Sequence, residues 1–343
     1  MRYSRFAVVL CVAALIPSAV AQDPWDWWPD PATHRGISAW VSYSRDYDTF
    51  WSNRTLVDQE VASIAQSGVD VVFLSISASA AQPYLQRLSY RTDSFTLDVQ
   101  YLLNSLGSSN VRACAAILSD NFTGSATQMQ RFVLVDYLLG FNTTRGPGDF
   151  GFTCVATDLE MAAGSRTAAV YDLWKQFHAS MQDRIGAAGG GLRLLAWMQG
   201  PDYLIERMDD PNDQDQLMQR EGITQDPIDP TLYDGALGYF TTQAGTPIFD
   251  AVIPMWYFTP PAPYYRRVDH NFAELQALGI PNLYLIPGLM IRNSTGLCCP
   301  GCVSGRADYD ARLGYNDGLR LQLSGLIGTG VFMWPIPADW TCP

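Results

Sequence analysis

Two carboxylates lie two residues apart at the end of an apolar segment, in the triplet Asp158-Leu159-Glu160. The near-continuous apolar run over residues 152–160 predicts a buried strand, and the alternation of side chains along a strand places Asp158 and Glu160 on one face. Two carboxylates at this spacing repel each other's charge, and burial also disfavours ionisation, so we expect one of them to have a raised pKa and to act as an acid near neutral pH. The protonation of a glycosidic oxygen requires such an acid. A solvated Asp-x-Glu pair, or an ion pair with an arginine, is the alternative interpretation.

Aromatic side chains gather near the same end of the other expected strands. Flat rings stack on the faces of sugars, while their polar atoms form hydrogen bonds with hydroxyl groups. These rings, with an aspartate and a glutamine expected after the third and fifth strands, are the candidate substrate-binding residues: Trp40, Tyr43, Asp120, Trp197, Gln199, Trp256 and Trp334. The alternative is that the rings belong to the hydrophobic core.

The residue types disfavour several other chemistries. The three histidines, His34, His178 and His270, are far apart in the sequence and lack a metal-binding spacing. The only lysine is Lys175, which lies in a helical segment. Ser-His-Asp catalysis, zinc hydrolysis and Schiff-base chemistry are therefore disfavoured, and we expect no metal and no cofactor. The formal net charge of -12 disfavours binding to nucleic acid or to anionic lipid.

Residues 1–21 have the pattern of a secretory signal peptide. Two arginines precede an apolar run over residues 6–16, and Ala19-Val20-Ala21 matches an A-x-A cleavage site. The apolar run is too short for a membrane span, and no later run is long enough for one. We therefore expect a secreted, extracellular, monomeric protein that begins at residue 22 and has no membrane segment.

Sequons and cysteines agree with secretion. Four Asn-x-Thr triplets are candidate glycosylation sites, at Asn53, Asn121, Asn142 and Asn293. Beyond residue 21 the cysteines are Cys114 and Cys154, in expected strands, and Cys298, Cys299, Cys302 and Cys342, in loop or tail sequence. For the four in loop and tail, secretion and the lack of a nearby histidine favour disulfides over a zinc site, with the pairing left open. The two strand cysteines are either bridged or plain buried thiols.

Eight short apolar runs, most of them followed by a segment with helical periodicity, lie along the rest of the chain. We expect strands at residues 36–43, 69–76, 111–118, 152–161, 192–198, 249–257, 282–289 and 330–334. Apolar strands that alternate with helices are typical of a parallel sheet covered by helices. The pattern predicts an α/β fold, a single (β/α)8 TIM barrel over residues 22–343, with a doubly wound open sheet as the alternative. The run Trp25-Asp26-Trp27-Trp28 predicts either another sugar platform or a plug at the bottom of the barrel.

Three of the expected strand ends resemble glycoside hydrolase family 18, the chitinase-type barrels. Asp158-x-Glu160 resembles the end of that family's fourth strand, the M-W-Y tripeptide at 255–257 resembles its sixth, and the run that ends in Trp334 resembles its eighth. The resemblance implies that Glu160 protonates the leaving oxygen and that Asp158 orients the acetamido group of the substrate. It also implies that Tyr257 forms a hydrogen bond with that group and that Trp334 is the floor of the subsite for the reacting sugar.

The sequence departs from this family at several positions. Thr153 and Ala156 replace the first two aspartates of its fourth-strand motif, and Phe258 replaces the aspartate after its tyrosine. Within the third expected strand, at residues 111–118, the stretch 115–118 lacks the family's glycine pair. These departures indicate a distant relative or a look-alike rather than a chitinase.

The expected function is hydrolysis of a polysaccharide or glycan, with N-acetylhexosamine-containing glycans among the candidate substrates. The sixth and seventh expected strands end without a second acid, which favours a mechanism in which the substrate supplies its own nucleophile. Direct two-carboxylate chemistry, with Asp120, Asp202 or Asp339 as the second acid, is a variant of this reading. A catalytically inactive barrel that binds carbohydrate or a protein partner is the alternative from another class.

Overall fold

The structure of the chain is a computed structural model. It describes residues 27–30, 32–41, 51–77, 87–88, 90–119, 135–159, 168–198, 247–254, 264–265, 268–269, 272, 283–293, 296–299, 302–322, 325–332 and 334–342. The expected signal peptide lies outside these residues.

Nine strands form one sheet in the order β7-β6-β5-β4-β3-β2-β1-β11-β8, and every neighbouring pair is parallel. The strands are β1 (Ile37–Val41), β2 (Val71–Ser77), β3 (Arg112–Ser119), β4 (Cys154–Leu159), β5 (Arg193–Met198), β6 (Ala251–Pro254), β7 (Tyr284–Leu285), β8 (Gly288–Met290) and β11 (Thr329–Phe332). Because the strands are parallel, all their carboxyl ends lie at one edge of the sheet.

β7 and β8 are two pieces of a single strand. β7 pairs with β6, β8 pairs with β11, and only residues 286 and 287 separate the two pieces. A bridge between Leu285 and Leu326, and a hydrogen bond of 2.9 Å from Gly330 N to Pro287 O, continue the pairing across the junction. The sheet therefore closes on itself with eight strand positions. This closure confirms the predicted (β/α)8 barrel and excludes the open sheet.

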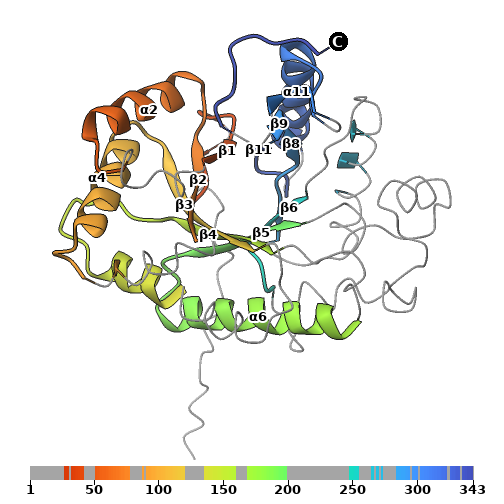
Figure 1. The fold of residues 1–343 in the computed structure, drawn as a ribbon. Coiled ribbons are helices and arrows are strands. Elements are labelled where there is room, and N and C mark those ends of the chain that lie inside the picture. Colours follow the sequence, from red (N-terminus) through yellow and green to blue (C-terminus); the bar gives the residue numbers. More distant parts are fainter. Residues whose placement is uncertain are drawn as a thin grey trace, which may run out of the picture.

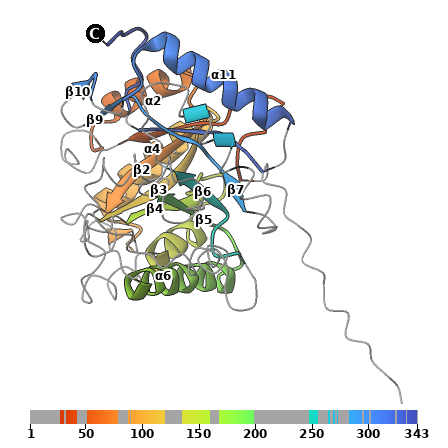
Figure 2. The same ribbon diagram turned by 90° about the vertical axis from the view of Figure 1, so that its right-hand side faces the viewer.

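Helices cover the outside of the barrel (Figure 1). The labelled helices are α2 (Arg54–Gln66), α4 (Ser94–Ser108), α6 (Ala168–Ala187) and α11 (Arg306–Gln322), and residues 135–143 form a further helix. α6 and α11 lie on opposite sides of the sheet (Figure 2). Among the described residues, no helix combines the length and the apolar character that a membrane span needs.

Buried apolar side chains form two separate clusters, because alternate residues of each strand face opposite ways. One cluster fills the inside of the barrel and includes Trp40 of β1, Phe73 of β2 and Trp197 of β5. The other lies between the barrel and its helices and includes Val57 and Val61 of α2. Both faces of the strands are thus apolar, which explains why the strands lack a polar alternation in the sequence.

Trp27 and Trp28 close the amino-terminal end of the barrel. Both belong to the inner cluster, and their ring centroids are 5.6 Å apart. Trp28 is fully buried, and its Nε1 lies 3.0 Å from the position that a Cβ would take at Gly36 or at Gly328. Gly36 also has a φ of 66°, which glycine adopts without strain. For Trp27 and Trp28 the plug is therefore confirmed.

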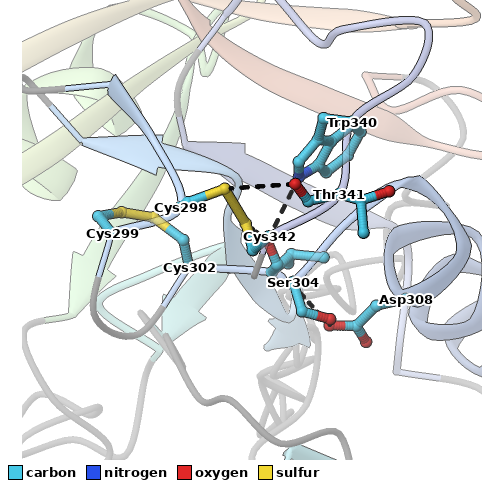
Figure 3. The surroundings of a disulfide bond; sticks show 9 residues. Cys298, Cys299, Cys302, Ser304, Asp308, Trp340, Thr341 and Cys342 are labelled. Atoms are coloured by element: carbon cyan, nitrogen blue, oxygen red, sulfur yellow. Dashed lines mark hydrogen bonds between the residues drawn. A yellow bond between two sulfur atoms is a disulfide. The ribbon is translucent and has the colours of Figure 1, made fainter.

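Four cysteines near the carboxyl terminus form two disulfides, Cys298–Cys342 and Cys299–Cys302 (Figure 3). Cys298 and Cys299 directly follow an antiparallel pair of short strands, β9 (Arg292–Asn293) and β10 (Gly296–Leu297). The backbone N–H of Cys342 donates to the carbonyl of Ser304 at 2.7 Å. The carboxyl-terminal segment is therefore fastened beside the start of α11. These pairs confirm the preference for disulfides over zinc.

Candidate active site

Asp158 lies near the carboxyl end of β4 and faces the inside of the barrel. It pairs in register with Leu118 of β3 and with Trp197 of β5. Cys154 and Ala156, which precede it on the same face of β4, belong to the inner cluster. Only 7% of the residue is exposed. A carboxylate is thus held at the end of the barrel where barrel enzymes have their active sites.

The ring of Trp197 extends across the inside of the barrel from the strand next to Asp158. Its centroid lies 5.6 Å from that of Trp40 and 5.4 Å from that of Phe73. A Cβ at Gly330 of β11 would lie 3.1 Å from Trp197 Cη2. The absence of a side chain at Gly330 therefore leaves room for the ring, and aromatic rings form a packed layer across the barrel.

Trp40 and Trp197, both expected to bind sugar, belong to the barrel core. Trp40 is 1% exposed and Trp197 is 3% exposed. Rings buried to this extent have no open face on which a sugar can stack. Trp40 and Trp197 are therefore core residues. They support the candidate site from within the barrel and do not stack on a sugar.

Trp334 lies after the end of β11, and its ring is not in the lumen. Its Nε1 donates a hydrogen bond to the carboxylate of Glu60 in α2, and the ring is buried in the outer cluster. Alternation would turn residue 334 inward, but the strand ends at Phe332. The expected position of Trp334 at the floor of a sugar subsite is therefore not observed.

Besides Trp28 Nε1 at the amino-terminal plug, two buried polar atoms further along the inside of the barrel have no hydrogen-bond partner within the part of the chain that the structure describes. They are Ser75 Oγ on β2 and Trp197 Nε1 on β5. Ser75 is 1% exposed and lies on the same face of β2 as Phe73. Buried polar groups are normally hydrogen-bonded, so these two atoms are suited to bind a water molecule or a sugar hydroxyl.

Thr157 fastens the end of β4 to α6 from the outer side of the barrel. Its hydroxyl lies 2.8 Å from His178 Nε2, and His178 Nδ1 lies 2.8 Å from the carbonyl of Trp174. Because a carbonyl only accepts, Nδ1 carries the proton and Nε2 accepts from the threonine. Both partners are buried. The pair positions the backbone next to Asp158, and sequence reasoning missed it because the two residues are 21 positions apart.

A disulfide joins β3 to β4 inside the barrel. Cys114 and Cys154 are direct partners in the parallel register, with their Cα atoms 4.5 Å apart. Both are fully buried members of the inner cluster. Of the two possibilities for these cysteines, the bridged form is the one observed. It cross-links the strand that carries Asp158 at a point four residues before it.

A perturbed carboxyl group lies at the opposite end of the barrel. Burial raises the pKa of Asp250, although hydrogen bonds from Leu194 N (2.8 Å) and from Arg193 act to lower it. Asp250 directly precedes β6, and its partners belong to the first two residues of β5. This carboxylate therefore joins the starts of two strands, which is a structural role.

Six predicted site residues lie outside the described residues: Tyr43, Asp120, Glu160, Gln199, Trp256 and Tyr257. Their roles stay predictions. Asn121, a candidate glycosylation site, also lies outside. Among the described residues, no group of three His, Cys, Asp or Glu side chains is arranged to hold a metal ion.

No protein-family model and no curated protein matches the chain. Solved structures with a similar fold include a glycoside hydrolase family 5 enzyme from Prevotella bryantii B14, with a TM-score of 0.51 and 11% sequence identity over 88% of this chain and 90% of that one. A β-glucosidase from Thermotoga maritima has a TM-score of 0.45 and 12% identity over 82% of this chain and 77% of that one. A β-glucuronidase from Parabacteroides merdae has a TM-score of 0.41 and 10% identity over 81% of this chain, which spans only 31% of that protein.

These likenesses bear on the fold. The family 5 enzyme covers nearly the whole chain, so the barrel described above is one that a glycoside hydrolase also uses. At this level of identity, a shared barrel does not assign a reaction, because barrels host many chemistries.

Proposed function

We propose that this chain is a glycoside hydrolase whose acid is Glu160. The observation that carries the proposal is the buried, inward-facing carboxylate of Asp158 near the carboxyl end of β4 in a closed parallel barrel. Barrel enzymes work at this end of their strands. Glu160 is the next residue on the same face of the chain if the alternation continues beyond β4. Most enzymes that cleave a glycosidic bond use two carboxyl groups.

The proposed reaction uses a nucleophile that belongs to the substrate. Glu160 gives its proton to the glycosidic oxygen as the bond from that oxygen to the anomeric carbon breaks. The carbonyl oxygen of a neighbouring N-acetyl group bonds to the anomeric carbon, while Asp158 orients that group and stabilises its positive charge. Tyr257 forms a hydrogen bond with the same group. Glu160, now a carboxylate, then takes a proton from the water that opens the cyclic intermediate.

The inner wall of the barrel supports this choice of mechanism. In the described parts of β5, β6 and β11, no acidic side chain faces the lumen beside Asp158. Trp197 and Ile253 occupy the inner face of β5 and β6 instead. The described parts of these strands therefore supply no second carboxylate about 5 Å from the first, as direct retaining chemistry requires. A substrate that carries its own nucleophile removes that requirement.

One observation favours a second candidate function, a glycan-binding barrel without catalysis. Ala156, where the family 18 motif has an aspartate, is fully buried directly before Asp158 on the inner face of β4. No carboxyl group at that position shares a proton with Asp158. A barrel that keeps the binding residues at the carboxyl end of its strands but lacks a carboxyl group at position 156 would bind a glycan and leave it intact.

Mass spectrometry of a glycan panel decides between these functions. The panel contains N-acetylated and non-acetylated polymers, incubated with the wild-type protein and with Glu160→Gln. Glu60→Gln, which makes the same chemical change on α2, is the matched control. Cleavage of an N-acetylated polymer by the wild type and by Glu60→Gln, but not by Glu160→Gln, supports the proposal. Cleavage of non-acetylated polymers alone removes the substrate-supplied nucleophile. Retention of a glycan without cleavage by any of the proteins establishes the binder.

We further propose that the chain is secreted and N-glycosylated, with occupancy that differs between sequons. Asn53 is exposed at the start of α2, where its Oδ1 accepts from Leu56 N at 3.3 Å. Asn142 instead uses both side-chain atoms on Phe152, donating from Nδ2 to the carbonyl (2.8 Å) and accepting at Oδ1 from the amide (3.1 Å). A glycan attaches to the side-chain nitrogen, so Asn53 suits a glycan and Asn142 does not.

A further inference from the structure

A cleft with a volume of about 460 Å³ lies at the amino-terminal end of the barrel, opposite the end that carries Asp158. Its volume falls in the range of small-molecule binding sites. The wall combines residues before β1, the end of α4, and the starts of β3 and β4, and it includes Asp30, His34, Leu103, Asn110, Arg112 and Phe150. No step of the proposed hydrolysis uses this cleft.

Phe150 presents an aromatic ring at the cleft. The ring lies against Gly107 of α4, because a Cβ at that glycine would fall 2.2 Å from two ring carbons. Phe150 is nevertheless 45% exposed. One face of the ring is therefore covered by the helix while much of the ring stays open. A single exposed ring is common on protein surfaces, so its support decides whether it has a use.

Side chains of α4 hold the backbone of Phe150 at both polar groups. Asn104 Oδ1 accepts from Phe150 N at 2.9 Å, and Gln100 Nε2 donates to the Phe150 carbonyl at 2.8 Å. The preceding residue is held as well, since Asn104 Nδ2 donates to Asp149 Oδ1 at 3.0 Å and Arg145 Nη1 donates to its carbonyl at 2.9 Å. The ring is thus fixed before any ligand arrives, which lowers the entropy cost of binding.

Polar groups of both kinds line the rest of the cleft. Asp30 supplies a carboxylate and Arg112 a guanidinium, so the wall carries opposite charges. Asn110, at a φ of 59°, supplies an amide that both donates and accepts. His34 Nδ1 is directed at the Asp70 carboxylate (2.8 Å), and its Nε2 is the remaining polar atom of the ring. This mixture suits a neutral ligand with many hydroxyl groups better than an anion or a cation.

We propose that this cleft is a second carbohydrate-binding site, which holds one or two rings of a neutral glycan. A pyranose has an apolar face that stacks on an aromatic ring, and a rim of hydroxyls that need both donors and acceptors. Phe150 provides the platform, and Asp30, Asn110 and Arg112 provide the polar partners. The choice of a sugar rests on the proposed function of the chain. The site itself lies at the other end of the barrel and needs no catalysis.

Hydrogen exchange with mass spectrometry locates the bound sugar. The probes are the tetrasaccharides of β-1,4-linked glucose, mannose and N-acetylglucosamine, each added at millimolar concentration to the Glu160→Gln protein. We expect at least one of them to slow exchange in residues 100–112 and 145–153. Phe150→Ala in the same background weakens binding at the site about tenfold and strongly reduces this protection. Leu97→Ala, which removes another exposed apolar side chain from α4, leaves it unchanged.

A second variant guards against a folding defect in Phe150→Ala. Asn110→Gly removes the amide and keeps the positive φ, and it too reduces the protection. The proposal is overturned if none of the three sugars protects these segments, or if protection survives both substitutions. Because protection needs no cleavage, a wild-type protein that hydrolyses nothing refutes the proposed function and leaves this site standing.

Discussion

Replacing Gly330 by alanine tests the packing that supports Asp158. A Cβ at this position would lie 2.9 Å from Ile253 Cγ2 and 3.1 Å from Trp197 Cη2. Carbon atoms in contact prefer separations of about 3.5–4.0 Å, so the neighbours must retreat by about 0.4–1.1 Å. Ile253 Cγ2 branches directly from Cβ and has little freedom to move. The change therefore transmits strain to β5 and β6 around the candidate site.

The expected cost is that of overpacking a filled core, about 1–3 kcal/mol in the free energy of unfolding. Urea unfolding of the two proteins measures it. Gly314→Ala is the matched control, because Gly314 lies in α11 with no neighbouring atom within 4 Å of its Cβ position. That substitution should stabilise the protein by up to about 1 kcal/mol, since alanine favours a helix over glycine.

A double-mutant cycle identifies the atoms responsible. Ile253→Leu moves the branch methyl away from Cβ, so it should recover about 1 kcal/mol when combined with Gly330→Ala. If Gly330→Ala is neutral or stabilising, the lumen is not filled as described. If the changes in unfolding free energy of the two substitutions are additive, Ile253 is not the residue that clashes with the new Cβ.

Three further results are expected. Thr157→Val should cost about 1–3 kcal/mol in unfolding free energy, because the buried histidine nitrogen on α6 loses its donor. As the pH falls from about 5 to 3, Asp308→Asn should lose less stability than the wild type. Burial alone would raise the pKa of Asp308, but hydrogen bonds from Arg312 and Ser304 outweigh burial and lower this pKa. The ionised carboxylate therefore stabilises the fold above the ordinary aspartate pKa, and this stabilisation is lost in acid. Glycopeptide mass spectrometry of protein secreted by a eukaryotic host should find Asn53 glycosylated and Asn142 largely bare.

Matched controls sharpen these expectations. Thr143→Val changes an exposed threonine and should cost less than about 0.5 kcal/mol. Asp310→Asn disrupts the exposed pair with Arg306 on the same helix as Asp308 and should leave the acid dependence almost unchanged. Equal effects of Thr157→Val and Thr143→Val would contradict the contact between Thr157 and His178. An unchanged acid dependence in Asp308→Asn would contradict the pair of Asp308 with Arg312. Full glycosylation at Asn142 would contradict its hydrogen bonds with Phe152.

The barrel was predictable because its strands repeat one strong pattern. Strands covered on both faces are apolar throughout, and helical segments separate them, which is the signature of parallel strands in a barrel. The positions at which the strands begin and end were less predictable. The seventh strand is expected as a single run over residues 282–289 but occurs as β7 and β8, since Pro287 has no N–H for the ladder.

The roles of the tryptophans were not predictable from alternation alone. Alternation tells which face of a strand a residue occupies and not what its ring packs against, so Trp40 and Trp197 were expected to be open to a sugar and are found packed in the core. Trp334 was expected to face inward, but β11 ends at Phe332 and the rule no longer applies. The Thr157–His178 contact joins a strand to a helix, and no local pattern encodes it.

To test directly whether Glu160 is the acid, we would compare the Glu160→Gln and wild-type proteins on two N-acetylhexosaminides that differ only in the leaving group. One carries a sugar, which must be protonated as it leaves, and the other carries dinitrophenolate, which needs no proton. If Glu160 is the acid, kcat/KM should fall about 10²–10⁴-fold for the sugar leaving group and much less for dinitrophenolate. An equal loss for both leaving groups, or no loss for either, would contradict the assignment of Glu160 as the acid.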